Sequence, residues 1–241
     1  MISVRTKLYF SMENLILQQF FVFTFPERHD KMCSYLYFSF LRGQTMDSNF
    51  FALISRMRYI ARWGLMRNAL PENIQEHSHM VAVLAHALGV IRRDIFHQPC
   101  DVNALATAAL YHDASEILTG DLPTPIKYHN AEIMSAYHAV EDLAVQKLLG
   151  MLPPELRATY ADVLAEDKGG DIYPLVKAAD KLSAYIKCIE ERKAGNNEFL
   201  SAEAQTRAAL EASPLPEVQY FLEHFIPAFE RDLDELGAIG Q

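Results

Sequence analysis

Cysteine is scarce in this 241-residue chain, and the three that occur lie far apart. Cys33, Cys100 and Cys188 form no C-x-x-C pair, and an odd number leaves one without an intramolecular partner. The pattern argues against a disulfide-stapled fold and against a thiolate metal site. Because it fits a reducing compartment, we expect the protein to be cytoplasmic.

Positive charge is also in short supply. The chain has 22 Lys and Arg against 31 Asp and Glu, a formal net charge of -9. This balance argues against a broad basic surface, so we expect neither nucleic acid nor a membrane among the partners. Any phosphate-bearing small molecule must therefore be held by a few local cations.

Long hydrophobic runs are absent as well. The most apolar stretch, 15–25, is shorter than the roughly 20 apolar residues of a membrane span, and no small-residue cleavage site follows it. It lies in the aromatic-rich segment 1–45, which carries a net charge of +2 and lacks clear helical periodicity. Regular patterning begins at Met46, with Ser48 as a capping residue before the first helix. We expect translation to start at Met46, so that 1–45 is not part of the native domain; an amphipathic membrane anchor is the alternative.

The rest of the chain, 46–241, is patterned for helices. Glycine is sparse, apolar residues recur at helical spacing, and no convincing run alternates with the period of a strand. Asp101 and Pro154 suit helix starts, and Gly195 suits a helix stop. The sequence therefore predicts one all-α domain with helices at about 49–59, 72–93, 102–118, 131–149, 154–166, 174–193, 202–211 and 215–236.

Residues with metal-binding side chains interrupt the apolar faces of three of these predicted helices. His77 lies one turn before the apolar stripe of 72–93. Helical spacing puts His112 and Glu116 on the apolar face of 102–118, with Asp113 beside it. Asp180 lies on the apolar face of 174–193.

Four such groups together favour a bound cation. Burying an ionisable group costs several kcal/mol unless it is paired or coordinates a cation, and a divalent ion offsets that cost for two imidazoles and two carboxylates. Each residue alone has a simpler interpretation. A lone inward histidine is usually a satisfied core residue, and a lone aspartate is usually a cap or an ion-pair partner.

The order His77, His112-Asp113, Asp180 resembles the HD superfamily of metal-dependent phosphohydrolases. The dipeptide alone is weak, and longer runs around it are more specific: RWGLMRN from Arg62, EHS from Glu76, YHDASEILTGDLPTP from Tyr111, KAADKL from Lys177 and GNNEF from Gly195. Together they resemble the bacterial 5′-deoxynucleotidase family (YfbR-type), from Asp47 to about Leu236. The resemblance implies a single HD-domain helical bundle.

The resemblance also implies a metal site and catalytic residues. The expected ligands of one divalent ion, Co, Mn or similar, are His77, His112, Asp113 and Asp180. Glu116 would orient or deprotonate the attacking water, and the planar guanidinium of Arg62 would grip the phosphate. From the residue alone, Arg62 could equally be an ordinary surface ion pair.

A substrate pocket follows from the same resemblance, lined by Arg62, Trp63, His77, Asp113, Asp121, Leu122, Pro123, Thr124 and Asp180. Trp63, the only tryptophan, would crowd the 2′ carbon of the sugar and disfavour ribose by about two orders of magnitude. Asp121 and Thr124 are candidate sugar contacts in a rigid loop. Trp63 could instead be a core residue, and Asp121 could be a local turn former.

The implied activity is metal-dependent release of inorganic phosphate from 2′-deoxyribonucleoside 5′-monophosphates, with little base specificity, by a homodimer. One alternative is an HD phosphohydrolase acting on a triphosphate, a cyclic dinucleotide or an alarmone. Others are a non-catalytic nucleotide-binding regulator and a structural helical protein without a ligand. Apolar residues of the last predicted helix suit either the core or a dimer interface: Tyr220, Phe221, Phe225 and Phe229.

Overall fold

The part of the chain that the computed structural model describes comprises residues 47–127, 129–165 and 170–237. From Ser48 onward these residues belong to one compact unit. Segment 1–45 and the predicted start at Met46 lie outside them. Apart from one isolated antiparallel bridge between Ala61 and Asn73, the described residues form no strand. The all-α prediction is therefore confirmed.

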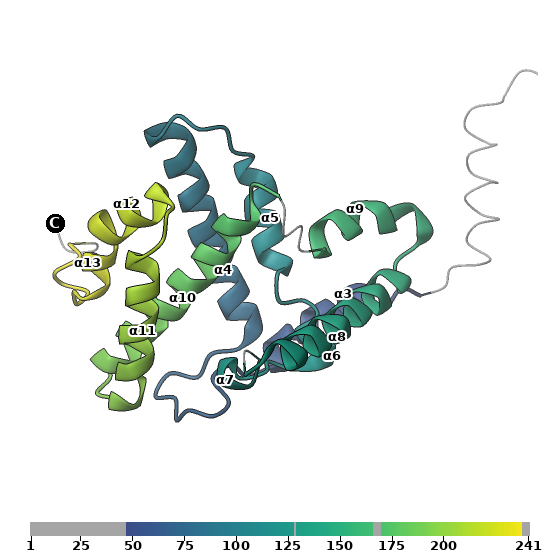
Figure 1. Cartoon of the computed structure of the whole chain (residues 1–241), viewed down its shortest axis with the longest axis horizontal. Helices are drawn as coiled ribbons and strands as arrows, with labels where there is room; N and C mark the ends of the chain where they lie inside the picture. The colour runs from purple at the N-terminus through teal and green to yellow at the C-terminus, as the bar shows by residue number, and fades with distance from the viewer. Residues whose placement is uncertain (1–46, 128, 166–169, 238–241) are drawn as a thin grey trace, which may run out of the picture. The chain divides into compact units, whose positions relative to one another are not determined.

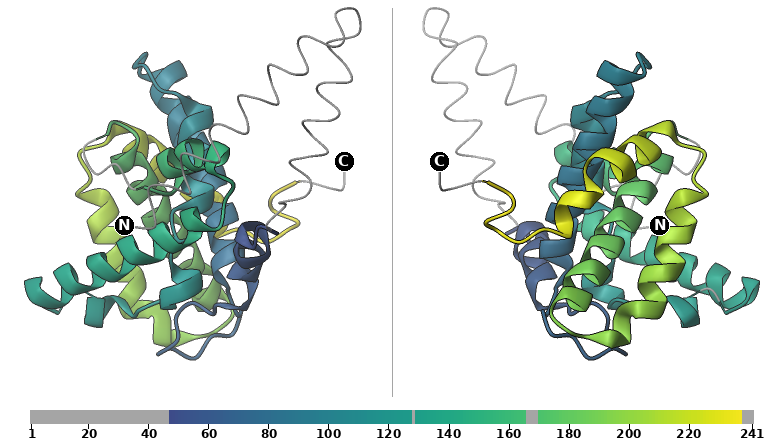
Figure 2. Two further views of the ribbon diagram at one scale, coloured as in Figure 1. Left: turned by 90° about the vertical axis from the view of Figure 1, so that its right-hand side faces the viewer. Right: turned by 90° about the vertical axis from the view of Figure 1, so that its left-hand side faces the viewer.

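Helices of very different lengths make up this unit (Figures 1 and 2). The α-helices are α3 (Phe50–Ile54), α4 (Ile74–Val90), α5 (Val102–Tyr111), α6 (Glu116–Thr119), α7 (Thr124–Lys127), α8 (Ala131–Gly150), α9 (Pro154–Leu164), α10 (Tyr173–Lys193), α11 (Leu200–Glu211), α12 (Pro216–His224) and α13 (Ile226–Phe229). The 3₁₀ segments are η1 (Ser55–Tyr59) and η3 (Asn197–Phe199), and a π-helical turn, η2 (Ile91–Ile95), extends α4. None of the described helices is long and apolar enough to cross a membrane.

Helix ends follow local chemistry in most cases. Asp101 caps α5 by accepting a hydrogen bond from the backbone of Ala104, and Pro154 opens α9. Gly195, at φ 84°, follows the end of α10 in a conformation that glycine adopts without strain. The prediction for Ser48 was wrong. Its hydroxyl contacts the Phe50 backbone at a long 3.4 Å but donates to the carbonyl of residue 151 at 2.6 Å, and the N-cap position belongs to the next residue.

Two predicted helices are broken. The segment 102–118 divides into α5 and α6 because short-range turns between 111 and 116 replace helical hydrogen bonds, so His112 and Glu116 lie on different helices. The segment 215–236 divides at Phe225, before Pro227, which has no backbone N–H to donate to a continuing helix. α7 was not predicted.

α4 and α10 pack together at the centre of the unit (Figure 1). Helices α11 to α13 lie on one side of them, and α5 with α9 lies on the other. The facing apolar side chains are buried: Val81, Leu84 and Leu88 of α4, Leu105 and Ala109 of α5, and Leu182, Ile186 and Ile189 of α10. Polar residues on these faces therefore lie where α4, α5 and α10 pack against one another.

Candidate functional site

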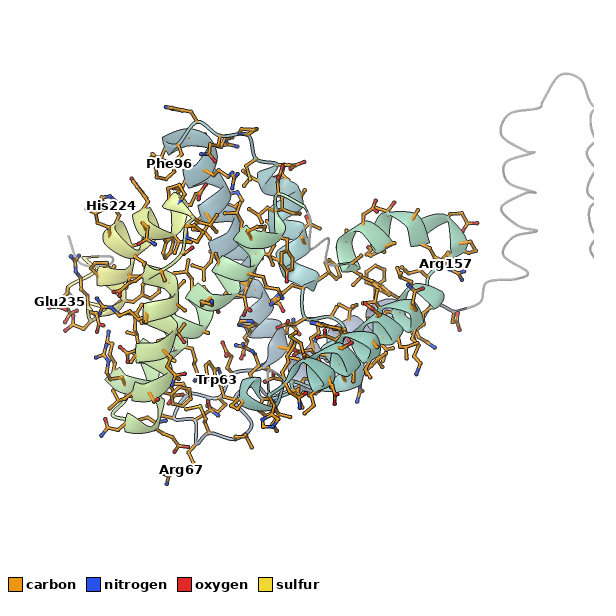
Figure 3. All side chains as sticks on the ribbon, viewed as in Figure 1. Trp63, Arg67, Phe96, Arg157, His224 and Glu235 are labelled. Atoms are coloured by element: carbon orange, nitrogen blue, oxygen red, sulfur yellow. The ribbon has the colours of Figure 1, made fainter. Side chains whose placement is uncertain are left out.

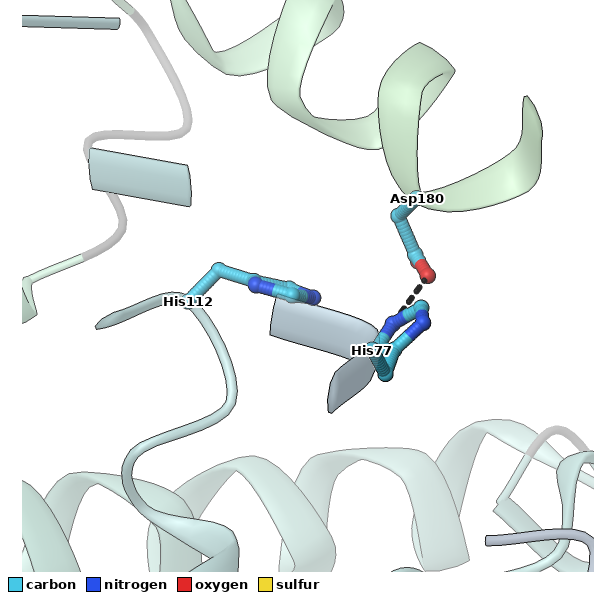
Figure 4. Close-up of side chains that lie close together, drawn as sticks. All are labelled: His77, His112 and Asp180. Atoms are coloured by element: carbon cyan, nitrogen blue, oxygen red, sulfur yellow. Dashed lines mark ion pairs between the residues drawn. The ribbon is translucent and has the colours of Figure 1, made fainter. Parts of the chain in front are cut away.

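The four predicted metal ligands meet between α4, α5 and α10. His77 comes from the first turn of α4, His112 and Asp113 follow α5, and Asp180 lies on α10. Nε2 of His77 lies 3.1 Å from Oδ1 of Asp180 and 3.6 Å from Oδ2 of Asp113, and Nε2 of His112 lies 3.1 Å from Oδ2 of Asp113. Ligand atoms of His77, His112 and Asp180 all fall within 4.8 Å of one another (Figure 4).

Both histidines present a buried nitrogen without a hydrogen bond. Nε2 of His77 and Nε2 of His112 have no hydrogen-bond partner among the described residues, although each lies 3.1 Å from a carboxylate oxygen. Buried polar atoms are normally satisfied, so two adjacent exceptions call for an explanation. Side chains that point at a common centre rather than at each other fit a cation, and imidazole with carboxylate is a set that divalent transition metals accept.

The other ring nitrogen of His112 favours ligation through Nε2, whereas that of His77 has two partners that suit opposite tautomers. Nδ1 of His112 lies 2.7 Å from the carbonyl of Ala109, and donation there leaves the lone pair on Nε2. Nδ1 of His77 lies 3.2 Å from Oγ of Ser183 and 2.8 Å from Nη1 of Arg62. Metal ligation through Nε2 requires a proton on Nδ1, which can be donated to Ser183. Arg62 can donate to Nδ1 only in the other tautomer.

Electrostatics keep the two aspartates ionised. Burial alone would raise the pKa of Asp113 and of Asp180, but His112 beside the first and His77 beside the second hold both pKa values well below their usual range. Burial would lower the pKa of His112, and Asp113 reverses this. Ionised carboxylates are the form that binds a metal.

A buried guanidinium and the single indole share one carboxylate beside the site. Nη1 of Arg62 and Nε1 of Trp63 lie 2.7 and 2.9 Å from Oε2 of Glu72. Burial would lower the pKa of Arg62, but Glu72, Asp180 and Asp113 outweigh it. Arg62 is thus ion-paired, but only 13 % of its side chain is exposed, so it is no ordinary surface pair.

Trp63 is neither a free surface residue nor a core residue. Its backbone has φ 60°, a conformation that is strained for a bulky side chain. Its half-buried ring meets the ring of Phe199 edge-on at 5.2 Å. Strained residues of this kind cluster at functional sites.

Glu116 begins α6 and is buried. Its Oε2 finds no hydrogen-bond partner in the described part of the chain. Burial, followed by the charges of Asp113 and Asp121, raises the pKa of Glu116 to about 10. Once ionised, Glu116 would be an avid proton acceptor.

The loop after α6 begins with Gly120 at φ 74°. Asp121 makes a hydrogen bond with the Trp63 backbone, so it lies beside the Arg62–Trp63 pair. Burial, together with the charge of Asp113, raises the pKa of Asp121, while the charge of Arg62 and this hydrogen bond oppose the rise. Leu122 and Pro123 are half-buried in the same loop. Thr124 begins α7, and its side chain lies outside what the structure describes.

Two residues of the site were missed from the sequence. Glu72 anchors both Arg62 and Trp63, but the sequence placed it only at the start of the predicted helix 72–93. Ser183 was missed because a serine on an apolar helix face does not by itself indicate a histidine partner. Its spacing of three residues from Asp180 was the available signal, since both lie on one helical face.

Known proteins resemble the chain over most of its length. Residues 49–229 match the family described as 5′-deoxynucleotidase YfbR-like. Proteins named 5′-deoxynucleotidase YfbR from Shigella boydii serotype 18 and from Escherichia coli are each 50% identical over 192 residues, which is 79% of this chain and 96% of theirs. An HD-domain phosphohydrolase from Listeria innocua has the same fold, with a TM-score of 0.67 at 24% identity over 75% of this chain and 88% of that one. The chain belongs to the 5′-deoxynucleotidase YfbR-like family.

Proposed function

We infer that the protein is a metal-dependent 5′-deoxynucleotidase, which hydrolyses 2′-deoxyribonucleoside 5′-monophosphates to a deoxynucleoside and inorganic phosphate. One observation carries this inference: two buried imidazoles and two half-buried carboxylates converge beside the guanidinium of Arg62. The names of the relatives at 50% identity support the same reaction.

His77, His112, Asp113 and Asp180 would hold one divalent cation, with Co²⁺ or Mn²⁺ as our first candidates. When bound, such a cation supplies positive charge that acidifies a water molecule and offsets charge on the phosphoryl group. The unpartnered Nε2 atoms of the two histidines support this assignment. The identity of the cation is decided by which ion restores activity to metal-stripped protein.

Arg62 and Glu116 are the catalytic residues that we propose. The fork of Arg62, oriented by Glu72, binds two phosphate oxygens. Glu116 orients the attacking water and, once ionised, takes its proton; burial raises the pKa of Glu116 in metal-free protein, and the positive charge of a bound cation would lower it. Such general acid–base catalysis supplies about 10²- to 10⁴-fold in rate.

Trp63 and the loop of Asp121, Leu122, Pro123 and Thr124 form the sugar pocket in this proposal. The indole is fixed by Glu72 on one side and by Phe199 on the other, so it is suited to act as a wall against a 2′-hydroxyl. An apolar wall rejects an added hydroxyl by about two orders of magnitude. Since the proposed contacts reach phosphate and sugar, we expect little discrimination among bases.

The products formed from dAMP and dATP test the proposed reaction. We expect inorganic phosphate from dAMP, a fall in kcat of about 10²- to 10⁴-fold in Glu116→Gln, and little change in Glu132→Gln, an exposed glutamate on α8. If the protein released pyrophosphate or triphosphate from dATP and left dAMP intact, it would be an HD phosphohydrolase of another class. Tight dAMP binding without turnover would make it a regulator.

We also propose that the protein is a cytoplasmic homodimer. The described cysteines, Cys100 and Cys188, are free, which suits a reducing compartment. Of the four aromatic residues considered for an interface, Phe221 is buried and Tyr220 and Phe229 pack partly against the core, whereas Phe225 is 45% exposed. Light scattering should give twice the chain mass of 27.4 kDa, and Phe225→Glu should lower it.

A further inference from the structure

Two buried charged residues on α10 have no part in the proposed reaction. Lys187 and Glu191, one turn apart, begin about two turns beyond Asp180, and their side chains are 4% and 0% exposed. Nζ of Lys187 donates to Oε1 of Glu191 and to the carbonyl of Leu70. A buried ion pair is often no more stabilising than well-packed apolar residues, so stability alone does not account for it.

The partners of this pair lie in the segment 67–70. Glu191 accepts hydrogen bonds from the backbone N–H of Ala69 at 2.8 Å and of Leu70 at 2.9 Å. Nδ2 of Asn196 donates to Oε2 of Glu191 and to the carbonyl of Arg67, both at 2.7 Å. Side chains from the end of α10 and the following turn therefore fix the backbone of a segment that has no regular secondary structure of its own.

Segment 67–70 begins four residues after Trp63 in the chain. The backbone N–H of Met66 donates to the Trp63 carbonyl at 2.9 Å, and the backbones of Arg62 and Glu72 close the base of the loop at 3.0 Å. Figure 3 shows Trp63 and Arg67 on the same side of the molecule. A strained φ of 60° at Trp63 persists only where the surrounding contacts hold it.

A second route from the ion pair reaches the indole ring. Nζ of Lys187 lies 5.6 Å from the centre of the Phe199 ring. Phe199 is fully buried and packs edge-on against Trp63. The pair thus contacts both supports of Trp63, the loop backbone and the ring beneath it.

We propose that Lys187 and Glu191 are positioning residues for sugar selection, which hold the Trp63 indole where it excludes a 2′-hydroxyl. The claim that Trp63 selects the sugar rests on the proposed function, whereas the claim that the ion pair positions Trp63 does not. Misplacement of a group by about 1 Å can cost 10²-fold, so a released loop should lose much of the discrimination.

The ratio of kcat/KM for dAMP to that for AMP, measured with the metal-loaded protein, tests the proposal. We expect this ratio to fall about tenfold or more in Glu191→Gln. The matched control is Glu211→Gln, which breaks an exposed pair with the same spacing, Arg207 with Glu211, and should leave the ratio unchanged. The ratio does not depend on how much protein is folded, so a merely structural role would not change it.

Fluorescence gives a readout that needs no turnover, because Trp63 is the only tryptophan in the chain. We expect a red-shifted emission and stronger acrylamide quenching in Glu191→Gln, but not in Glu211→Gln. If Glu191→Gln fails to fold, the double variant Lys187→Met, Glu191→Leu fills the same space with apolar side chains and should show the same loosening.

Unchanged emission, quenching and dAMP:AMP ratio in a folded variant would overturn the proposal. If the wild-type protein released phosphate from neither nucleotide, the proposed function would fail. The fluorescence comparison would still decide whether the pair positions Trp63.

Discussion

Replacing Glu116 by glutamine in metal-free protein should change how stability depends on pH. Burial, with Asp113 and Asp121 next, raises the pKa of Glu116 to about 10 from an ordinary value of 4.5. Between these values the folded protein keeps a proton on Glu116 that the unfolded chain has lost. Folding therefore takes up a proton, and the free energy of unfolding falls as the pH rises.

The size of this effect follows from one proton. Each pH unit in this window changes the free energy of unfolding by at most about 1.4 kcal/mol, so Glu116 should destabilise the fold by about 3 kcal/mol more at pH 8 than at pH 6. Glutamine has nearly the same shape and does not titrate. The Glu116→Gln variant should therefore lack this part of the pH dependence.

Urea unfolding in EDTA at pH 6, 7 and 8 measures the difference. The stability of Glu116→Gln relative to wild type should rise by about 1.4 kcal/mol per pH unit, while that of the exposed Glu132→Gln should stay flat. Parallel pH dependences for wild type and Glu116→Gln would refute the raised pKa of Glu116 in metal-free protein.

Three further predictions concern the metal site, the sugar wall and the buried ion pair. Mn²⁺ at 100 times its Kd should stabilise the wild-type protein by about 2.7 kcal/mol, which raises Tm by roughly 5–11 °C. Calorimetry should find the same rise in the control variant Asp162→Asn, which changes an exposed residue, but no rise in Asp180→Asn. Trp63→Ala should raise kcat/KM for AMP relative to dAMP tenfold or more in a phosphate-release assay, and an unchanged ratio would remove the indole from sugar selection. Burial alone would raise the pKa of Glu191, but hydrogen bonds, that of Lys187 first, hold it at about 2. The stabilisation from ionised Glu191 is then present above pH 4.5 and lost as the pH falls toward 2. Urea unfolding should find Glu191→Gln less stable than wild type at pH 7, with a difference in the free energy of unfolding that narrows below pH 4.5. A difference that stays constant with pH would contradict this.

The ligands on α4 and α10 could be predicted because long amphipathic helices repeat their buried face every 3.6 residues. His77 and Asp180 fall on those faces, and both prove to point inward. The position of Glu116 could not be predicted in this way. No glycine or proline marks the end of α5, where the His112 ring hydrogen-bonds to the Ala109 carbonyl.

The ion pair of α10 shows a different limit of sequence patterns. Opposite charges four residues apart usually indicate a solvent-exposed helix face. Lys187 and Glu191 have this spacing but are buried, because their partners are backbone groups more than 100 residues earlier in the chain. Periodicity carries no information about such partners. The strained backbone of Trp63 was hidden for the same reason, since its causes are tertiary contacts.

A phosphate-release assay on matched dAMP and AMP tests the central claim most directly. The protein is first stripped of metal, and Co²⁺, Mn²⁺, Mg²⁺ or no ion is then restored. We predict release from dAMP that depends on the added ion and exceeds release from AMP by about two orders of magnitude. No release with any ion, or equal release with and without metal, would contradict the assignment of a metal-dependent 5′-deoxynucleotidase.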